Sequence, residues 1–477
     1  MLAIWTPLVA VLVSPAFPRF VESLRDHTAT PDVAKNRLRA ATPLWNDAVA
    51  AYNSLAYRMG VSPQPASAVV GRWGWLFLGD RFDRNLAQAV GRDALDATQA
   101  TQWVETASLQ RRWLAARGIA SMIIIAPAKW SIYPDMLPAW TTAVTKTHSF
   151  DRLLEYRATL PLLDLRPTLR EARHHADTYS PFNSHWNDYG AYIGWLAITR
   201  HLNERVHGLE KLAAPLLSGV AERDDGNEFA AMLSIERPNP WTTVQLQAPL
   251  ADVDILDDSG HARKVVGNTS TDLLDLPRTT HTAVARSPMR ALVLRDSSGN
   301  SLSPYLQDAF ADTLQVDQHW AEPNRRPNLP ALVQQYKPDV VFWIMTERYL
   351  GQPFGDLSYW RSATAFDCAR ADAGSTESVL VAAPSASGAA GRAHPAKQVA
   401  LVVIDSSLES IAHLRWNDDK GEGDRLIAVV PGRNDVFVEI SGHVVDGSVS
   451  VTGSGAKLVE VRSRSSLDTS SSDECNR

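Results

Sequence analysis

One serine and one histidine of this chain have the surroundings that nucleophilic catalysis requires. Ser297 follows an apolar stretch at 291–294 and precedes a helical stretch, so its hydroxyl and its own backbone N–H would meet at a strand-to-helix turn. His185 lies in the polar segment NSHWNDYG at 183–190, where another helix is expected to begin. A serine hydroxyl is a weak nucleophile unless a base lies within hydrogen-bond reach. The two residues are therefore candidates for nucleophile and base in an acyl-transfer site.

Each candidate also has an explanation that involves no catalysis. Ser297 could simply cap the helix that follows it, because serine is a favoured N-cap residue. His185 could be a solvated or capping residue near a helix start, or could bind a metal together with His174 and His175. Adjacent histidines converge poorly on one ion, so we expect no metal site. We also expect no cofactor.

The elements that would position this pair have the pattern of an α/β domain. Short apolar runs separated by helical stretches predict a doubly wound parallel sheet, because parallel strands are buried on both faces. Ligands bind such sheets at the carboxyl ends of the strands. Lys129, Asp296, Ser297 and Arg348 all follow predicted strands at that edge. The expected strands are 121–126, 160–165, 291–294 and 339–345, and the expected helices are 95–118, 149–157, 187–206 and 301–312.

Composition narrows the class of protein. The net charge is −6 without a long Lys/Arg run, which argues against a nucleic-acid partner. The chain has two cysteines, which excludes metal sites of the CxxC type and a disulfide-dense scaffold. Cys368 and Cys475 could form one bridge in an oxidising compartment. The first charged residue is Arg19, so residues 1–18 are expected to be a signal or membrane-anchor segment.

The remaining chain divides by pattern. A hairpin is expected within 67–80, and six short strands separated by turn residues predict a small β-sandwich near the C-terminus. The expected units are a helical lead-in at 19–65, the α/β domain at 66–350 with an irregular insertion at 207–285, a linker at 351–397, the sandwich at 398–465 and a disordered tail at 466–477.

Five segments, in this order, resemble the alginate O-acetyltransferase family with its SGNH-hydrolase-like domain. They are GRWGWLFL at 71–78, IIIAPAKWSIYPDMLP at 123–138, NSHWNDYGA at 183–191, LVLRDSSGNSLSPYL at 292–306 and TERYL at 346–350. The resemblance covers roughly residues 67–350 and implies an SGNH-like α/β fold. It also implies that the His-bearing segment precedes the Ser-bearing one, as it does here.

Carried over residue by residue, the resemblance makes Ser297 the nucleophile and His185 the general base. The family has an Asp two positions before the His, and Asn183 stands there in this chain. An amide can accept a hydrogen bond from the imidazole but brings no charge, and the same Asp→Asn change in a serine protease lowers turnover by about 10⁴-fold. Asp188 or Asp177 could supply the missing charge.

The resemblance also implies a function. Family members acetylate exopolysaccharides in the periplasm, with acetyl groups passed on by a membrane-bound acyltransferase partner. Lys129, Tyr133, Asp296 and Arg348 lie in or beside matched segments and would orient the sugar or the donor. We therefore expect a periplasmic polysaccharide O-acetyltransferase, which the N-terminal segment could anchor to the inner membrane. The alternatives are an acetyl-esterase of the same fold and a catalytically weak glycan-binding protein of a polysaccharide export system, with the sandwich holding the glycan.

Overall fold

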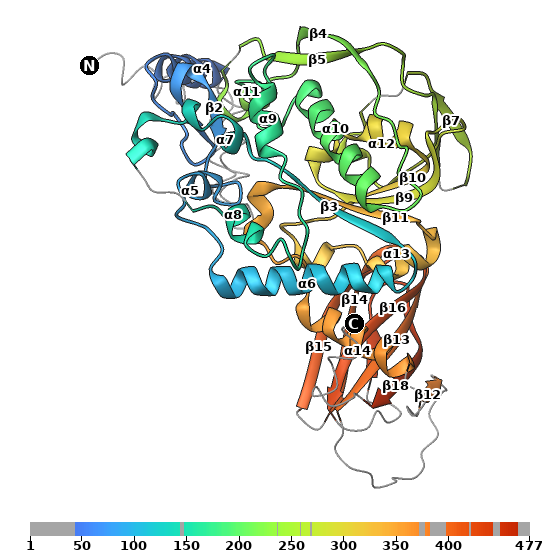
Figure 1. Ribbon diagram of the computed structural model, residues 1–477. Coiled ribbons are helices and arrows are strands. Elements are labelled where there is room, and N and C mark those ends of the chain that lie inside the picture. Colours follow the sequence, from blue (N-terminus) through green and yellow to red (C-terminus); the bar gives the residue numbers. More distant parts are fainter. Residues whose placement is uncertain are drawn as a thin grey trace.

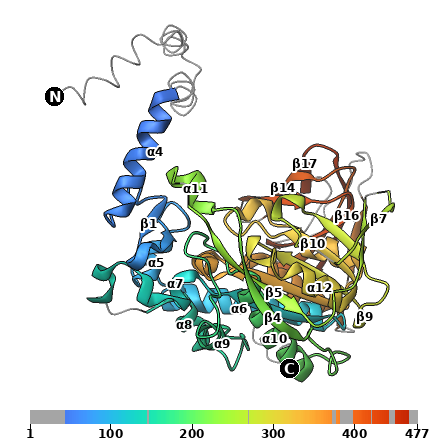
Figure 2. The same cartoon turned by 90° about the horizontal axis from the view of Figure 1, so that it is seen from above.

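The computed structural model describes residues 43–143, 147–235, 237–257, 259–267, 270–371, 377–381, 397–418, 421–441 and 449–465. The expected signal or anchor segment and the expected disordered tail lie outside these ranges. Helix α4 (Pro43–Arg58) projects from the body beside strand β1 (Ala68–Val70) (Figure 2). Within the described ranges, no helix combines the length and the apolar character needed to cross a bilayer.

A seven-stranded sheet forms the centre of the α/β domain (Figure 1). Its first four strands are parallel, and the last three pair antiparallel. The predicted parallel sheet is therefore confirmed for one half, whereas the other half makes the sheet mixed. In spatial order the strands are β3 (Ala120–Ala126), β11 (Val340–Thr346), β9 (Ser287–Arg295), β10 (Phe310–Asp317), β8 (Arg278–His281), β6 (Val253–Leu256) and β7 (Ala262–Val265).

Helices cover both faces of the parallel half. Leu292 and Leu294 of β9 pack into a core with the helices of one face, and Ala291 and Val293 pack into a second core with the helices of the other. This alternation explains why the strand is continuously apolar: each face is buried. The first face carries α6 (Ala97–Ala115), α8 (Ser149–Leu154), α13 (Leu329–Tyr336) and α14 (Leu357–Ala371), and the second carries α9 (Arg166–Ala172), α10 (Asp188–Arg205) and α12 (Ser303–Ala309).

Two predicted elements differ from the structure. The stretch 160–165 is not a strand and touches the sheet through a single bridge, Ile124 to Leu163. Pro161 lacks an N–H for a ladder, and Asp164 binds the backbone N–H and guanidinium of Arg166, which begins α9. The helix predicted at 301–312 ends at Ala309, and strand β10 begins at the next residue.

The described residues of 207–285 form regular strands and helices rather than an irregular insertion. It supplies β6, β7 and β8 of the central sheet, and a separate antiparallel pair, β4 (Leu217–Asp224) with β5 (Pro240–Leu246). Between that pair lies the short helix α11 (Glu228–Leu233). Phe229 and Leu233 of α11 are buried against the hairpin of β1 and β2 (Leu76–Leu78). The insertion therefore packs on the hairpin that precedes the sheet.

The C-terminal region consists of two small antiparallel sheets around their own apolar core. All six predicted strands are present, and helix α14 occupies part of the stretch expected to be a linker. Cys368 on α14 is disulfide-bonded, and Cys475 lies outside the described residues. The sheets are β12 (Glu377–Val381), β18 (Ala456–Ser465), β13 (Lys397–Ser406) and β16 (Gly432–Ser441), and β15 (Gly421–Val429), β14 (Ser410–Asp418) and β17 (Val449–Thr452).

Candidate active site

The structure brings the two predicted catalytic residues into contact. The hydroxyl oxygen of Ser297 lies 2.8 Å from Nε2 of His185, although the residues are 112 positions apart in the chain. Ser297 begins a 3₁₀ turn directly after β9, and His185 lies just before α10. Both are at the carboxyl edge of the parallel strands, where ligands bind α/β sheets.

A buried arginine, Arg295, supports the turn that holds Ser297. Arg295 is completely buried, and its guanidinium donates to Gln315, to the Asp296 carbonyl, to Asn300 and to the Thr271 carbonyl. Burial lowers the pKa of Arg295 to about 10, against the opposing effect of nearby acids. Because the guanidinium has donors in several fixed directions, it locks the backbone of the turn on several sides.

One N–H of the same turn is left to stabilise an oxyanion. The N–H of Ser298 donates to the Asp296 carboxylate at 2.8 Å, and that of Gly299 donates to the Asp296 carbonyl at 3.1 Å. The carboxylate of Asp296 also accepts from the N–H and hydroxyl of Thr346. Among the described residues, the N–H of Ser297 has no acceptor. It is the donor of this turn that is free to bind the charge developing in acyl transfer.

The histidine loop is tied to the serine loop next to the catalytic contact. The indole N–H of Trp186 donates to the carbonyl of Ser298 at 2.9 Å, so neighbouring residues on both loops are paired. The side-chain oxygen of Asn183 lies 3.0 Å from Nδ1 of His185 and also accepts from its backbone N–H. An acceptor at Nδ1 places the ring proton there and leaves the lone pair of Nε2 facing the serine, which is the tautomer that a general base needs.

A carboxylate that the sequence analysis did not identify lies beside the same histidine. Oε2 of Glu228 is 3.7 Å from Nδ1 of His185 and accepts from the N–H of Ser184 at 2.6 Å. Oε1 accepts from the Ser184 hydroxyl at 2.9 Å. Burial would raise the pKa of Glu228, but the nearby His185 and the two bonds from Ser184 outweigh it and lower the pKa to about 2. The group is therefore ionised at neutral pH.

The two acids considered in the sequence analysis lie elsewhere. Asp177 accepts from the hydroxyl of Tyr133, and Asp188 pairs with Arg223 at 3.5 Å. Among the described residues, neither forms a hydrogen bond or ion pair with His185, whereas Glu228 lies 3.7 Å from its Nδ1. No local pattern identified Glu228, because it belongs to a polar segment, DDGNE, that is typical of a turn.

The four residues expected to orient substrate are engaged inside the protein. The ammonium of Lys129 donates to the carbonyls of Leu76, Pro181 and Asn183, and burial lowers its pKa well below the ordinary value. The hydroxyl of Tyr133 donates to Asp177 and accepts from the N–H of Thr178. Arg348 donates to the hydroxyl of Tyr349 and lies 3.6 Å from Asp83, and the carboxylate of Asp296 accepts from the N–H groups of Ser298 and Thr346. These contacts indicate that the four residues hold the loops of the site in place rather than bind a sugar.

Within the described ranges, no group of three metal-ligating side chains gathers, and His174 and His175 are exposed after α9. The arrangement offers a serine, a base and a nearby acid.

Comparisons with known proteins agree with the sequence resemblance. Residues 68–271 match the model of the SGNH hydrolase-like domain of the acetyltransferase AlgX. The matched range contains Asn183, His185 and Glu228 and ends before Ser297. A search of the curated proteins gave no match.

Three solved structures are similar to this chain at low identity. PatB1 of Bacillus cereus is 16% identical, with 61% of this chain and 98% of that chain covered and a TM-score of 0.44. AlgX of Pseudomonas aeruginosa is 14% identical, with 88% and 99% covered and a TM-score of 0.44. The O-acetyltransferase domain of Pseudomonas putida AlgJ is 17% identical, with 60% and 92% covered and a TM-score of 0.35. The family match confirms the resemblance: over residues 68–271, this chain carries an SGNH hydrolase-like domain of the AlgX acetyltransferase type.

Proposed function

We propose that this protein transfers acetyl groups to hydroxyls of an exopolysaccharide or cell-surface glycan through an acetyl-Ser297 intermediate. The observation that carries the proposal is the 2.8 Å contact between the Ser297 hydroxyl and Nε2 of His185, in a domain of an acetyltransferase family. A base at that distance can take the hydroxyl proton as the serine attacks.

In the first half-reaction, Nε2 of His185 takes the proton of Ser297 while the serine oxygen bonds to the acetyl carbonyl carbon of the donor. The N–H of Ser297 donates to the resulting oxyanion. When the tetrahedral intermediate collapses, the bond between the acetyl carbon and the donor's oxygen or sulfur breaks. The leaving group takes the proton from His185, and acetyl-Ser297 remains.

In the second half-reaction, a sugar hydroxyl takes the place of the leaving group. His185 removes its proton as the sugar oxygen attacks acetyl-Ser297, and the same N–H holds the oxyanion. Collapse breaks the bond to the serine oxygen, which recovers its proton from His185. The products are an O-acetylated sugar and the starting enzyme.

We also propose a source for the acetyl groups and a compartment for the reaction. The acetyl donor would be supplied by a membrane-bound acyltransferase partner, with this protein acting in the periplasm. Support for both comes from the resemblance of the five sequence segments, and the N-terminal segment would hold the protein at the inner membrane or be removed.

The test is an acetyl-ester assay on the full chain, with and without an acceptor oligosaccharide. We expect Ser297→Ala to abolish turnover of 4-nitrophenyl acetate, and mass spectrometry of the wild type to find acetyl groups on the oligosaccharide. Ser301→Ala, in the same loop, is the matched control and should retain activity. Hydrolysis without transfer to any acceptor would replace the proposal with an esterase, and glycan binding without Ser297-dependent turnover would replace it with a binding protein.

A further inference from the structure

The catalytic site contains a histidine without the carboxylate that usually accompanies it at Nδ1. Such a carboxylate does two things: it holds the imidazole in one tautomer, and it stabilises the imidazolium that forms during reaction. Asn183 performs the first through its side-chain oxygen, 3.0 Å from Nδ1. As a neutral amide, it cannot perform the second.

Glu228 occupies a position from which it can perform the second. Its Oε2 is 3.7 Å from Nδ1 of His185, and its carboxylate is fixed by the two bonds from Ser184, the residue preceding the histidine. The next residue, Phe229, is fully buried against the hairpin of β1 and β2, which anchors the start of α11. The carboxylate is thus held near the imidazole by contacts that do not depend on substrate.

We infer that the role of the triad acid is divided in this protein, with Asn183 fixing the tautomer of His185 and Glu228, from the insertion, supplying the negative charge. The inference rests on the proposed function of Ser297 and His185. It gives the 207–285 insertion a positioning role in the site, and it explains how a site with Asn at the usual Asp position can remain active.

The variant Glu228→Gln tests the charge, because Gln keeps the size and one acceptor for Ser184. We expect kcat for 4-nitrophenyl acetate to fall about 100-fold with KM unchanged, since the charge acts as the imidazolium forms. The acid limb of the kcat/KM profile should move to lower pH, because the protonated imidazole loses a nearby anion. Glu222→Gln, an exposed carboxylate on β4 of the same insertion, is the matched control and should leave both unchanged.

The double variant Glu228→Gln with Asn183→Asp separates charge from structure. A carboxylate returned at position 183 should restore kcat to within about tenfold of the wild type, because one group then performs both roles. If Glu228 only supported the loop, Asn183→Asp would restore nothing and the acid limb would not move. Either result overturns the inference, as would a Glu228→Gln variant within twofold of the wild type.

A second readout keeps this test independent of acetyl transfer. The rate at which phenylmethanesulfonyl fluoride modifies Ser297, followed by mass spectrometry, measures activation of the serine without any acetyl donor or sugar. We expect the rate to fall in Glu228→Gln and to recover in the double variant. If Ser297 reacts in this pattern but no acetyl transfer occurs, the proposed function fails and the divided acid stands. An unaltered rate in Glu228→Gln overturns the divided acid.

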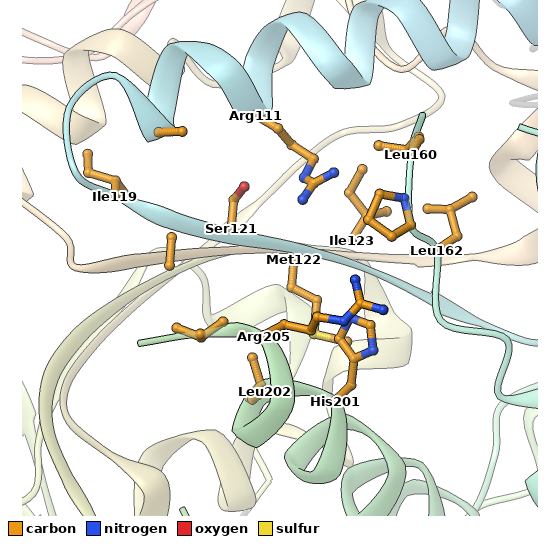
Figure 3. Close-up of a pocket in the computed structure, with 14 residues that line it drawn as sticks. Arg111, Ile119, Ser121, Met122, Ile123, Leu160, Leu162, His201, Leu202 and Arg205 are labelled. Carbon is orange, nitrogen blue, oxygen red and sulfur yellow. The ribbon is translucent and has the colours of Figure 1, made fainter. Parts of the chain in front are cut away.

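A cavity-lining group of basic residues lies at the amino-terminal end of β3, away from the catalytic edge. A cavity of about 320 Å³ lies there, with Arg111 entering from α6 and His201 and Arg205 from α10 (Figure 3). Burial and the charge of Arg205 lower the pKa of Arg111. None of the described carboxylates forms an ion pair with either arginine, although the charge of Glu204 acts on His201. Two like charges therefore share a cavity without a described counter-ion.

We infer that this cavity, the β3 pocket, binds a small organic carboxylate. The arginines offer paired donors to a carboxylate, and Ile119, Leu160 and Leu162 on its wall would contact an alkyl chain. The test is calorimetric titration of the full chain with hexanoate, with inorganic phosphate as the comparison. Arg205→Gln, at an exposed residue, should weaken hexanoate binding at least about tenfold, whereas Arg200→Gln on the same helix should not. Absence of hexanoate binding, equal affinity in both variants, or tighter binding of phosphate would overturn the inference.

Discussion

The serine side and the acid side of this site are held by different kinds of structure. Ser297 follows β9, which lies between β11 and β10 in the central sheet and is buried on both faces. Beneath its turn, Arg295 makes bonds to four partners. Glu228 begins a six-residue helix between two strands that are outside the central sheet, and β4 is largely exposed.

The difference shows that acyl transfer needs a precise position for the nucleophile but only an approximate one for the charge. A nucleophile must meet the carbonyl carbon within a few tenths of an ångström, so its turn is built into the most buried part of the fold. A charge that stabilises an imidazolium acts through space and tolerates a looser support. We therefore expect perturbations of the serine turn to cost more free energy of unfolding than perturbations of helix α11, which carries the acid.

The largest expected effect is the loss of the brace under the serine turn. Arg295→Met should lower the free energy of unfolding by about 3 kcal/mol, because the acceptors on Gln315 and Thr271 lose their donor in a buried environment. Urea denaturation measures this. Arg263→Met, at an exposed residue of β7, should change stability by less than about 0.5 kcal/mol. A loss under 1 kcal/mol in Arg295→Met would remove the contrast between the two sides.

The bond between the serine and histidine loops should have the next largest effect. Trp186→Phe keeps most of the buried ring but removes the N–H that donates to the Ser298 carbonyl. We expect kcat to fall about 30-fold with little change in KM, since a misalignment of a fraction of an ångström between base and nucleophile is costly. Steady-state kinetics on an acetyl ester measures it, with Trp140→Phe at an exposed indole as the control. A fall of less than threefold would show that the sheet alone aligns the pair.

The buried parallel strands could be predicted from the sequence, whereas the strands of the insertion could not. Strands β3, β9 and β11 are continuous apolar runs, so their positions, and the polar residues that follow them, could be read directly. The pairing of Ser297 with His185 followed from those positions and from the resemblance. The sequence does not predict strands β7 and β8, because ARKV and RTTH are short and polar, without an apolar alternation, and β6, with the sequence VDIL, is only four residues long.

Glu228 was missed for a different reason. A carboxylate is recognised as a partner of a histidine only through tertiary proximity, and here Ser184 and Glu228 are 44 positions apart. The four residues expected to orient substrate were identified by their type and position, but their contacts lie within the protein. Lys129 is a cation at a strand end, as a ligand-binding residue would be, yet it binds three backbone carbonyls. The residue type indicates the chemistry available but does not identify the partner.

The ionisation of Glu228 should make stability depend on pH. A carboxyl whose pKa is lower in the folded than in the unfolded state stabilises the fold above its unfolded pKa, and this contribution is lost as the pH falls. With a folded pKa of about 2, the wild type should be more stable than Glu228→Gln by about 1–2 kcal/mol at pH 6. The difference should shrink between pH 5 and about pH 2.

Urea denaturation of both proteins across that range measures the difference. Comparing the two is necessary because Asp151 also has a lowered pKa, owing to its hydrogen bond with His148 and, against the effect of burial, its pairing with Arg166. That contribution is common to both proteins and cancels. A difference that does not vary with pH would mean that the charge of Glu228 is not coupled to the fold.

The smallest expected effect comes from the cap of α11. The side chain of Asn227 accepts from the N–H of Ala230, and Asn227→Ala should cost about 1 kcal/mol in local stability. Because this helix carries Glu228, kcat should also fall about threefold. Asn328→Ala removes the corresponding cap of α13, on a face of the sheet that carries no catalytic group, so it should lower stability similarly without changing kcat. Hydrogen exchange of α11 together with kinetics distinguishes the two variants. If both lower kcat equally, the effect reflects general stability and α11 has no particular link to the histidine.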